Sequence, residues 1–182
     1  MLLNADSSHL MVIDVQARLL PAMAEAQQVT ARGNILLAAA RELDIPITIT
    51  EQYPRGLGPT DAALALADDD AVMEKIAFSC LRDQAIAARL EELRQDGRHQ
   101  MVICGIESHV CVLQTTLDLA DAGYETFVVA DAVSSRAQNS VDLALARMRD
   151  EGVSIVNTEM AVFEWLKQAG TQQFKTLSAL IK

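Results

Sequence analysis

Cys111 lies where an apolar strand pattern changes into a helical pattern. Residues 101–104 are apolar, a glycine follows, and apolar residues then recur at helical spacing, which predicts a buried strand leading into a helix. Cys111 is expected on the first turn of this helix, where unpaired N–H groups and the helix dipole favour a thiolate nucleophile. Unpaired cysteine is also among the most often buried residue types, and Cys104, inside the apolar run, fits that description better than Cys111 does.

A carboxylate and an amine stand at the ends of two other predicted strands. Asp14 closes the apolar run of residues 10–14, and Lys75 lies near the end of a short run at 72–76. Ligands of open parallel sheets bind beyond the carboxyl ends of the strands, so both side chains are expected at the same edge as Cys111. There the carboxylate can take the thiol proton and the ammonium can hold the resulting charges. Taken singly, Asp14 also fits a cap or ion-pair partner, and Lys75 a solvated surface group.

Strand and helix patterns alternate along the chain. Strands are predicted at 10–14, 45–50, 72–76, 101–104, 125–130 and 153–156. Helices are predicted at 29–43, 111–123, 139–151, 158–166 and 171–180, and another, capped by either Ser79 or Asp83, ends near residue 95. Two prolines and two glycines within residues 51–60 predict an ordered loop without regular secondary structure after the second strand, in a position where substrates are usually bound. This alternation predicts an α/β fold of the three-layer Rossmann-like type, with a mostly parallel central sheet of about six strands and helices on both faces. We expect a single domain over residues 1–182.

Charge and composition restrict the partners. The formal net charge of −10 opposes binding to a nucleic-acid backbone or an anionic lipid surface. No apolar segment has the length of a membrane span, the N-terminus does not have the pattern of a signal peptide, and three irregularly spaced cysteines do not suggest a disulfide framework. A cytoplasmic protein is therefore expected. The first strand is followed by Val-Gln-Ala-Arg rather than a glycine-rich phosphate loop, which argues against a nucleotide-binding domain.

Three segments together resemble a known family. Asp14-Val15-Gln16, the segment around Lys75 and residues 105–112 (GIESHVCV) resemble the signature elements of the isochorismatase-like cysteine hydrolase superfamily. Residues 50–60 and 131–136 resemble the branch that contains isochorismatase domain-containing proteins 1 and 2, and the similarity extends over nearly the whole chain. The resemblance implies a triad of Asp14, Lys75 and Cys111. In such a triad, Cys111 attacks a carbonyl to form a thioester, and Asp14 acts first as general base and then as acid.

The resemblance also implies the surroundings of the triad. The oxyanion hole would consist of the backbone N–H groups of Glu107 and Cys111, next to a cis peptide bond between Ile106 and Glu107. Arg55 could receive a substrate carboxylate, although an exposed loop arginine is more often simply solvated. The residues expected to contact substrate are Gln16, Gln52, Tyr53, Phe78 and His109.

Two departures from related branches indicate the reaction. The nicotinamidase branch holds a metal with an aspartate and histidines after the second strand, whereas residues 51–60 here contain no histidine. The isochorismatases that cleave a vinyl ether generally lack the nucleophilic cysteine. We therefore expect a hydrolase of small amides that needs no metal or cofactor and forms a homo-oligomer through its C-terminal helices. The alternatives are a catalytically silent interaction subunit and a hydrolase of another small-molecule C–N or C–O bond.

Overall fold

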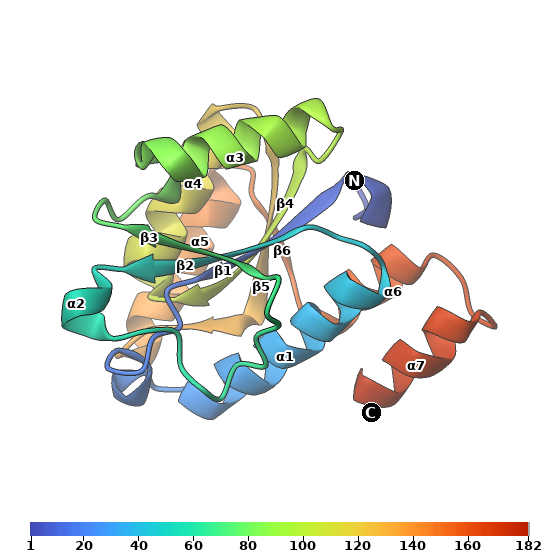
Figure 1. Cartoon of the computed structure of the whole chain (residues 1–182), viewed down its shortest axis with the longest axis horizontal. Helices are drawn as coiled ribbons and strands as arrows, with labels where there is room; N and C mark the ends of the chain where they lie inside the picture. Colours follow the sequence, from blue (N-terminus) through green and yellow to red (C-terminus); the bar gives the residue numbers. More distant parts are fainter. Residues whose placement is uncertain (182) are drawn as a thin grey trace.

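The computed structural model describes residues 1–181, which contain one six-stranded sheet (Figure 1). Its strands are β1 (Ser8–Ile13), β2 (Ile47–Gln52), β3 (Ala71–Lys75), β4 (Gln100–Ile106), β5 (Glu125–Ser134) and β6 (Ser154–Val156). Their order is β3-β2-β1-β4-β5-β6, and every neighbouring pair is parallel. The predicted α/β fold is confirmed, and the sheet is wholly rather than mostly parallel.

Helices cover both faces of the sheet. They are α1 (Ala26–Glu42), α2 (Pro54–Leu57), α3 (Gln84–Gln95), α4 (Leu113–Asp121), α5 (Gln138–Asp150), α6 (Thr158–Leu166) and α7 (Gln172–Ile181). Apolar side chains of α1, α6 and α7 pack in one cluster, and those of α3, α4 and α5 pack in another on the opposite face. Helix α7 lies beside α1 and α6 at one end of the molecule (Figure 1). Within residues 1–181, no helix is both long and apolar enough to cross a membrane.

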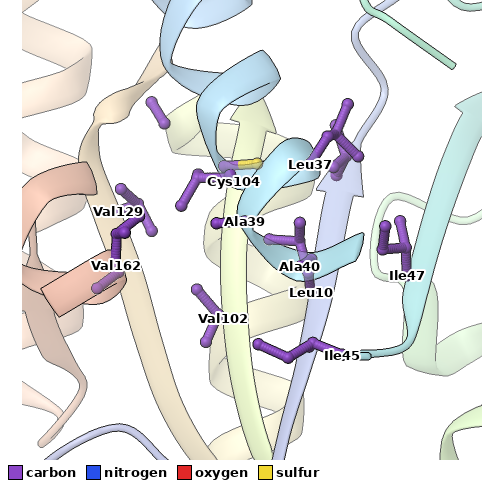
Figure 2. Close-up of a cluster of buried hydrophobic side chains, with 14 of the residues drawn as sticks. Leu10, Leu37, Ala39, Ala40, Ile45, Ile47, Val102, Cys104, Val129 and Val162 are labelled. Atoms are coloured by element: carbon purple, nitrogen blue, oxygen red, sulfur yellow. The ribbon is translucent and has the colours of Figure 1, made fainter. Parts of the chain in front are cut away.

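Strand β4 is buried on both faces, so its side chains are apolar on both. Val102 and Cys104 point into the cluster under α1, whereas Met101 and Ile103 belong to the opposite cluster. Figure 2 shows Cys104 packed against α1, among aliphatic side chains. This alternation follows from the two-residue repeat of a strand. It places Cys104 in the core on the face away from Cys111.

Residues 51–60 differ from the irregular loop that their prolines and glycines suggested. Strand β2 continues to Gln52, and Pro54 then opens the short helix α2. Proline is tolerated at the first position of a helix because its missing N–H would have no intrahelical acceptor there. Glu51 closes the segment, since its Oε1 accepts hydrogen bonds from the N–H and the hydroxyl of Thr60 at 2.6 and 2.7 Å. The loop after β2 is therefore ordered by its own side chains.

Strand β5 is longer than its apolar run indicated. The prediction ended it near residue 130, but it continues to Ser134 through a register shift against β4. Ile103 pairs with Val128, whereas Gly105 pairs with Val133. The shift brings the residues after β5 to the carboxyl edge of the sheet, next to the end of β4.

The strand order determines where that edge opens. The chain proceeds from β1 through β2 to β3 on one side and from β4 to β6 on the other. In open parallel sheets a crevice forms where the order reverses, outside the carboxyl ends of the two strands. Here that crevice lies between the ends of β1 and β4.

Candidate active site

Asp14 is the residue directly after β1, and its carboxylate is wholly buried. Its φ angle of 53° is in the left-handed region, which is uncommon for a side-chain-bearing residue and most frequent in Asp and Asn. Oδ2 lies 2.6 Å from Nζ of Lys75, and Oδ1 accepts a hydrogen bond of 2.7 Å from the Thr50 hydroxyl. Each carboxylate oxygen therefore has a donor.

Lys75 ends β3, and its side chain points into the molecule rather than into solvent. Nζ donates to Oδ2 of Asp14 at 2.6 Å, to Oε1 of Gln52 at 2.8 Å and to the carbonyl oxygen of Phe78 at 3.2 Å. An ammonium group has three protons, so these acceptors use all of them. Burial is the largest single influence and lowers the pKa of Lys75, but the charge and hydrogen bond of Asp14 together with Cys80 and Cys111 outweigh it and raise the pKa above 10.5. Lys75 is thus a buried cation at neutral pH.

Cys111 lies on a single π-helical turn, Ser108–Val112, directly before α4. Its Sγ is 4.0 Å from Oε1 of Gln52, and the residue is 5% exposed. Burial raises the pKa of the Cys111 thiol, the Asp14 carboxylate raises it further, and Lys75 only partly opposes them. The helix N-terminus favours a thiolate, but burial and the Asp14 carboxylate oppose it in the unliganded protein, and the role of Cys111 as nucleophile stays a prediction. The thiol therefore holds its proton more tightly than a free cysteine does, and its Sγ–H points to Oε1 of Gln52.

The other two thiols are more deeply buried. Cys80 contacts the Thr50 hydroxyl at 3.9 Å, and burial raises its pKa to about 11. Cys104 lies in the core, where burial raises its pKa to about 12. Neither has the 5% exposure of Cys111.

The segment between β4 and Cys111 has unusual backbone geometry. The peptide bond between Ile106 and Glu107 is cis, at the position named by the resemblance. Gly105 has a φ of 118°, and a Cβ there would lie 2.1 Å from the carbonyl oxygen of Ile13, so only glycine fits. The Glu107 carbonyl accepts the N–H groups of Val110 and Val112 at 3.0 and 3.2 Å. These bonds fix the turn that carries Cys111, while the oxyanion role of the Glu107 and Cys111 N–H groups stays a prediction.

Two glutamines predicted to bind substrate differ in what they contact. Gln52 lies in the site, where Oε1 faces both Lys75 and Cys111 and Nε2 donates to the carbonyl of Ile76 at 2.7 Å. Gln16 is wholly buried and bonds backbone groups only. Its Nε2 donates to the carbonyls of Gln52 and Gly58 at 3.0 and 2.7 Å, and its Oε1 accepts the Gln52 N–H at 2.8 Å. Gln16 therefore positions Gln52 and the following loop, and both of its amide protons are already donated to the protein.

The remaining predicted contacts are partly exposed. Tyr53 and Phe78 are each about half exposed, and the Phe78 carbonyl holds Lys75. Nδ1 of His109 lies 2.9 Å from the hydroxyl oxygen of Ser135. Tyr53 borders a cavity of about 290 Å³. The other residues that line it are Pro54, Arg55, Glu74, Lys75, Ile76 and Asp83.

Sequence reasoning did not assign roles to Thr50 or Arg136. Thr50 donates to Asp14, and Arg136 donates its backbone N–H and its Nε to Oε2 of Glu107 at 3.1 and 3.0 Å. The alternation Ile-Thr-Ile-Thr in β2 was a signal for Thr50, because it places two hydroxyls on one face of a buried strand. The partner of Arg136 depends on the β4–β5 register shift, which no local pattern indicates.

Within residues 1–181, no group of three or more His, Cys, Asp and Glu side chains is arranged to hold a metal ion. The crevice instead contains a carboxylate, an ammonium and a thiol. That set suits proton transfer and nucleophilic attack.

Comparison with known proteins shows the family. The isochorismatase domain matches residues 8–160. The chain belongs to the isochorismatase-like hydrolase family. Isochorismatase domain-containing protein 2A of Mus musculus is 39% identical, covering 97% of this chain and 84% of the relative. The secreted isochorismatase effector Isc1 of Phytophthora sojae is 38% identical, covering 97% and 85%.

A solved structure agrees with this membership. The MAR1 ribonuclease from Caenorhabditis elegans has a TM-score of 0.91 and is 32% identical, covering 100% of this chain and 92% of that one. The predicted resemblance to this family is thus confirmed, and it extends over nearly the whole chain.

Proposed function

We propose that this protein is a metal-independent cysteine hydrolase of a small amide, with Cys111 as nucleophile, Asp14 as proton acceptor and donor, and Lys75 as the cation that positions the carboxylate. The observation that carries the proposal is the buried hydrogen-bonded cluster at the carboxyl edge of the sheet. Lys75 bridges Asp14 and Gln52, and Sγ of Cys111 lies 4.0 Å from the same Oε1 of Gln52 that Lys75 contacts. A nucleophile in reach of an oriented base is the arrangement that acyl transfer requires.

The raised pKa of the thiol determines how the first step proceeds. Because Cys111 keeps its proton in the free protein, Asp14 takes that proton as sulfur attacks the substrate carbonyl. A C–S bond forms, the carbonyl π electrons move to oxygen, and the N–H groups of Glu107 and Cys111 stabilise the oxyanion. Asp14 then returns the proton to the leaving nitrogen as the C–N bond breaks. The products are an amine, or ammonia, and a thioester on Cys111.

Water completes the reaction by the reverse exchange. Asp14 accepts a proton from water as its oxygen attacks the thioester, and the proton then passes to sulfur as the C–S bond breaks. A carboxylic acid leaves, and the Cys111 thiol is restored. Lys75 remains charged throughout, because its raised pKa lies far above neutrality, and it holds Asp14 in one orientation through both steps.

RNA is a less suitable substrate. The Caenorhabditis elegans neighbour is named a ribonuclease, but the net charge of −10 here would repel a phosphate backbone. The buried ammonium of Lys75 has three protein acceptors, so it offers no donor to a phosphate. A small amide remains the better candidate.

The setting of the enzyme is part of the proposal. The free thiols Cys80, Cys104 and Cys111 suit a reducing compartment such as the cytoplasm. Exposed apolar side chains on α6 and α7, among them Met160, Phe163 and Leu180, support a homo-oligomer. The complete hydrogen-bonded cluster favours an active enzyme over a silent interaction subunit.

A substrate screen tests the proposal. Small amides, carbamates and ureas would be incubated with the wild-type protein, Cys111→Ala and the matched control Cys104→Ala. We expect product from wild type and Cys104→Ala, none from Cys111→Ala, and an acyl adduct on the Cys111 peptide by mass spectrometry. Turnover by Cys111→Ala at the wild-type rate would disprove the nucleophile assignment.

A further inference from the structure

Gln52, the last residue of β2, presents its side-chain amide to Cys111 in a defined orientation. Oε1 accepts a hydrogen bond from Nζ of Lys75 at 2.8 Å and lies 4.0 Å from Sγ of Cys111, whose thiol is the donor. Nε2 donates to the carbonyl oxygen of Ile76 at 2.7 Å. Exchanging the amide oxygen and nitrogen would place the NH₂ group against two donors and the oxygen against a carbonyl. Only one orientation of the amide therefore satisfies its neighbours.

The backbone of Gln52 is fixed as well. The Gln16 side chain accepts the Gln52 N–H at 2.8 Å and donates to the Gln52 carbonyl at 3.0 Å. Gln52 is also only 8% exposed. A side chain that is already ordered loses little conformational entropy when it contacts a ligand. Oε1 is thus a preorganised hydrogen-bond acceptor next to the proposed nucleophile.

One of the two donors to Oε1 is lost during the proposed reaction. An amide oxygen has two lone pairs, and here they face the Lys75 ammonium and the Cys111 thiol. Lys75 keeps its protons because its pKa is raised. The thiol gives its proton to Asp14 as the C–S bond forms, so Cys111 no longer donates to Oε1. One lone pair of Oε1 is therefore free once the substrate carbon has become tetrahedral.

The free lone pair lies within reach of the leaving group. In the tetrahedral intermediate the leaving atom is bonded to the same carbon as sulfur. An acceptor 4.0 Å from Sγ can then form a hydrogen bond of ordinary length with an N–H on that atom. The oxygen of an ester at this place has no proton, and its lone pairs would face those of Oε1. Oε1 therefore favours a leaving nitrogen that carries hydrogen.

We propose that Gln52 selects the leaving group: its Oε1 accepts an N–H of the departing nitrogen, so that the substrates are amides with at least one N–H rather than tertiary amides or esters. This inference rests on the proposed cysteine hydrolysis. The Asp14 carboxylate and Oε1 of Gln52 both accept from Nζ of Lys75, which holds them close to each other. Asp14 gives its proton to the nitrogen as the C–N bond breaks, while Gln52 binds an N–H of the same nitrogen.

The alternative is that Gln52 only positions Lys75. In that case removal of Oε1 would slow the hydrolysis of every substrate by the same factor. The ratio of amide to ester hydrolysis distinguishes the two roles, because a weakened Lys75 contact affects both reactions alike. The intrinsic reactivity of the esters also cancels when this ratio is compared between variants.

The probes are acetamide, butyramide and benzamide, with the methyl ester and the N,N-dimethylamide of each acid. The value of kcat/KM would be measured for the wild type, Gln52→Met, Gln52→Glu and the control Thr50→Val. The control removes the hydroxyl bond to Asp14 and leaves Gln52 in place. Thermal unfolding checks that each variant is folded, and Gln52→Ala replaces Gln52→Met if the latter does not fold.

We expect Gln52→Met to lower the ratio of amide to ester kcat/KM about tenfold, the effect of one hydrogen bond at the upper end of the range for neutral groups. Gln52→Glu keeps an acceptor oxygen and should keep the wild-type ratio, and so should Thr50→Val, although both variants turn over more slowly. Gln52→Met should slow the N,N-dimethylamides no more than the esters, because neither has an N–H.

A ratio that Gln52→Met leaves unchanged would refute the inference, as would an equal loss of the ratio in Thr50→Val. Hydrolysis of esters that depends on Cys111, without hydrolysis of any amide, would also refute the N–H contact. That result would leave the nucleophile assignment in place. The failure of the inference is thus distinguishable from the failure of the cysteine mechanism.

Binding to Cys111→Ala decides the case in which no probe is turned over. This variant lacks the thiol donor, so Oε1 is free to accept an N–H. In NMR titrations the primary amide should bind more tightly than its N,N-dimethylamide, and the double variant Cys111→Ala/Gln52→Met should lose this preference. Equal affinities in Cys111→Ala would overturn the inference. A preference that depends on Gln52, without any turnover, would keep the recognition and refute the hydrolase.

Discussion

Replacing Lys75 with methionine removes the cation from a wholly buried ion pair. Its Nζ lies 2.6 Å from Oδ2 of Asp14, and neither side chain contacts solvent. Removing one partner of a buried pair costs about 3–5 kcal/mol, because the remaining charge has lost its counterion. In a chain of this size each kcal/mol lowers the melting temperature by roughly 2–4 °C. We therefore expect Lys75→Met to melt about 6–20 °C below the wild type.

A double variant tests whether the unpaired carboxylate causes the loss. Asp14→Asn combined with Lys75→Met places a neutral amide beside the methionine, and the Thr50 hydroxyl still has an oxygen to bond. The double variant should be more stable than Lys75→Met alone in urea unfolding at pH 7, although both lack activity. A double variant that is no more stable than Lys75→Met would refute this account, as would a Lys75→Met protein as stable as the wild type.

The pH dependence gives an independent check on the same pair. The pKa of Lys75 is raised above its ordinary value of 10.5 by Asp14. The folded state therefore holds this proton more tightly than the unfolded state, and the resulting stability is complete below pH 10.5 and lost as the pH rises through the folded pKa. The difference in unfolding free energy between the wild type and the Asp14→Asn/Lys75→Met double variant, in which neither position titrates, should stay constant around neutrality and narrow only in strong alkali. A difference that narrowed near pH 7 would contradict the assignment.

Three further outcomes are expected. Iodoacetamide should label Cys111 before Cys80 or Cys104, because Cys111 is the most exposed, and its rate should keep rising above about pH 8.5, because its pKa is raised; peptide mass spectrometry would show a different order if the nucleophile is misassigned. Thr50→Val should lower kcat/KM about tenfold, since the hydroxyl bond to Asp14 is lost, and Thr50→Ser should restore it; equal kinetics of the two variants would exclude a positioning role. Exhaustive chelation should leave turnover unchanged, whereas a loss reversed by zinc, iron or manganese would show that a metal takes part.

The sequence determined the fold because its signals are local. Residues 10–13 and 101–104 are apolar throughout, which is typical of strands buried on both faces. Helical patterns between such strands predict parallel crossover connections. Parallel strands place their carboxyl ends at one edge. For that reason Asp14, Lys75 and Cys111 could be expected close together from sequence alone, and the structure does bring them together.

Residues 51–60 show where local signals were insufficient. Their prolines and glycines indicated irregular structure, but Pro54 opens a helical turn and Glu51 closes the segment on Thr60. Gln16 is a second example: the sequence suggested a substrate contact, whereas its amide donates hydrogen bonds to backbone carbonyls of this segment. These hydrogen-bond partners are separated along the chain, so the periodicity of apolar residues does not indicate them.

Tertiary structure alone decided the ionisation and the surroundings of the site. A helix N-terminus favours a thiolate at Cys111, but burial and the Asp14 carboxylate raise the pKa of its thiol, because desolvation acts on a charge wherever the fold removes water. Likewise, the β4–β5 register shift moved Arg136 onto Glu107. Residue types are given by the sequence, and strand ends can be predicted from it. Burial, strand register and the distances between charged groups depend on how the chain packs.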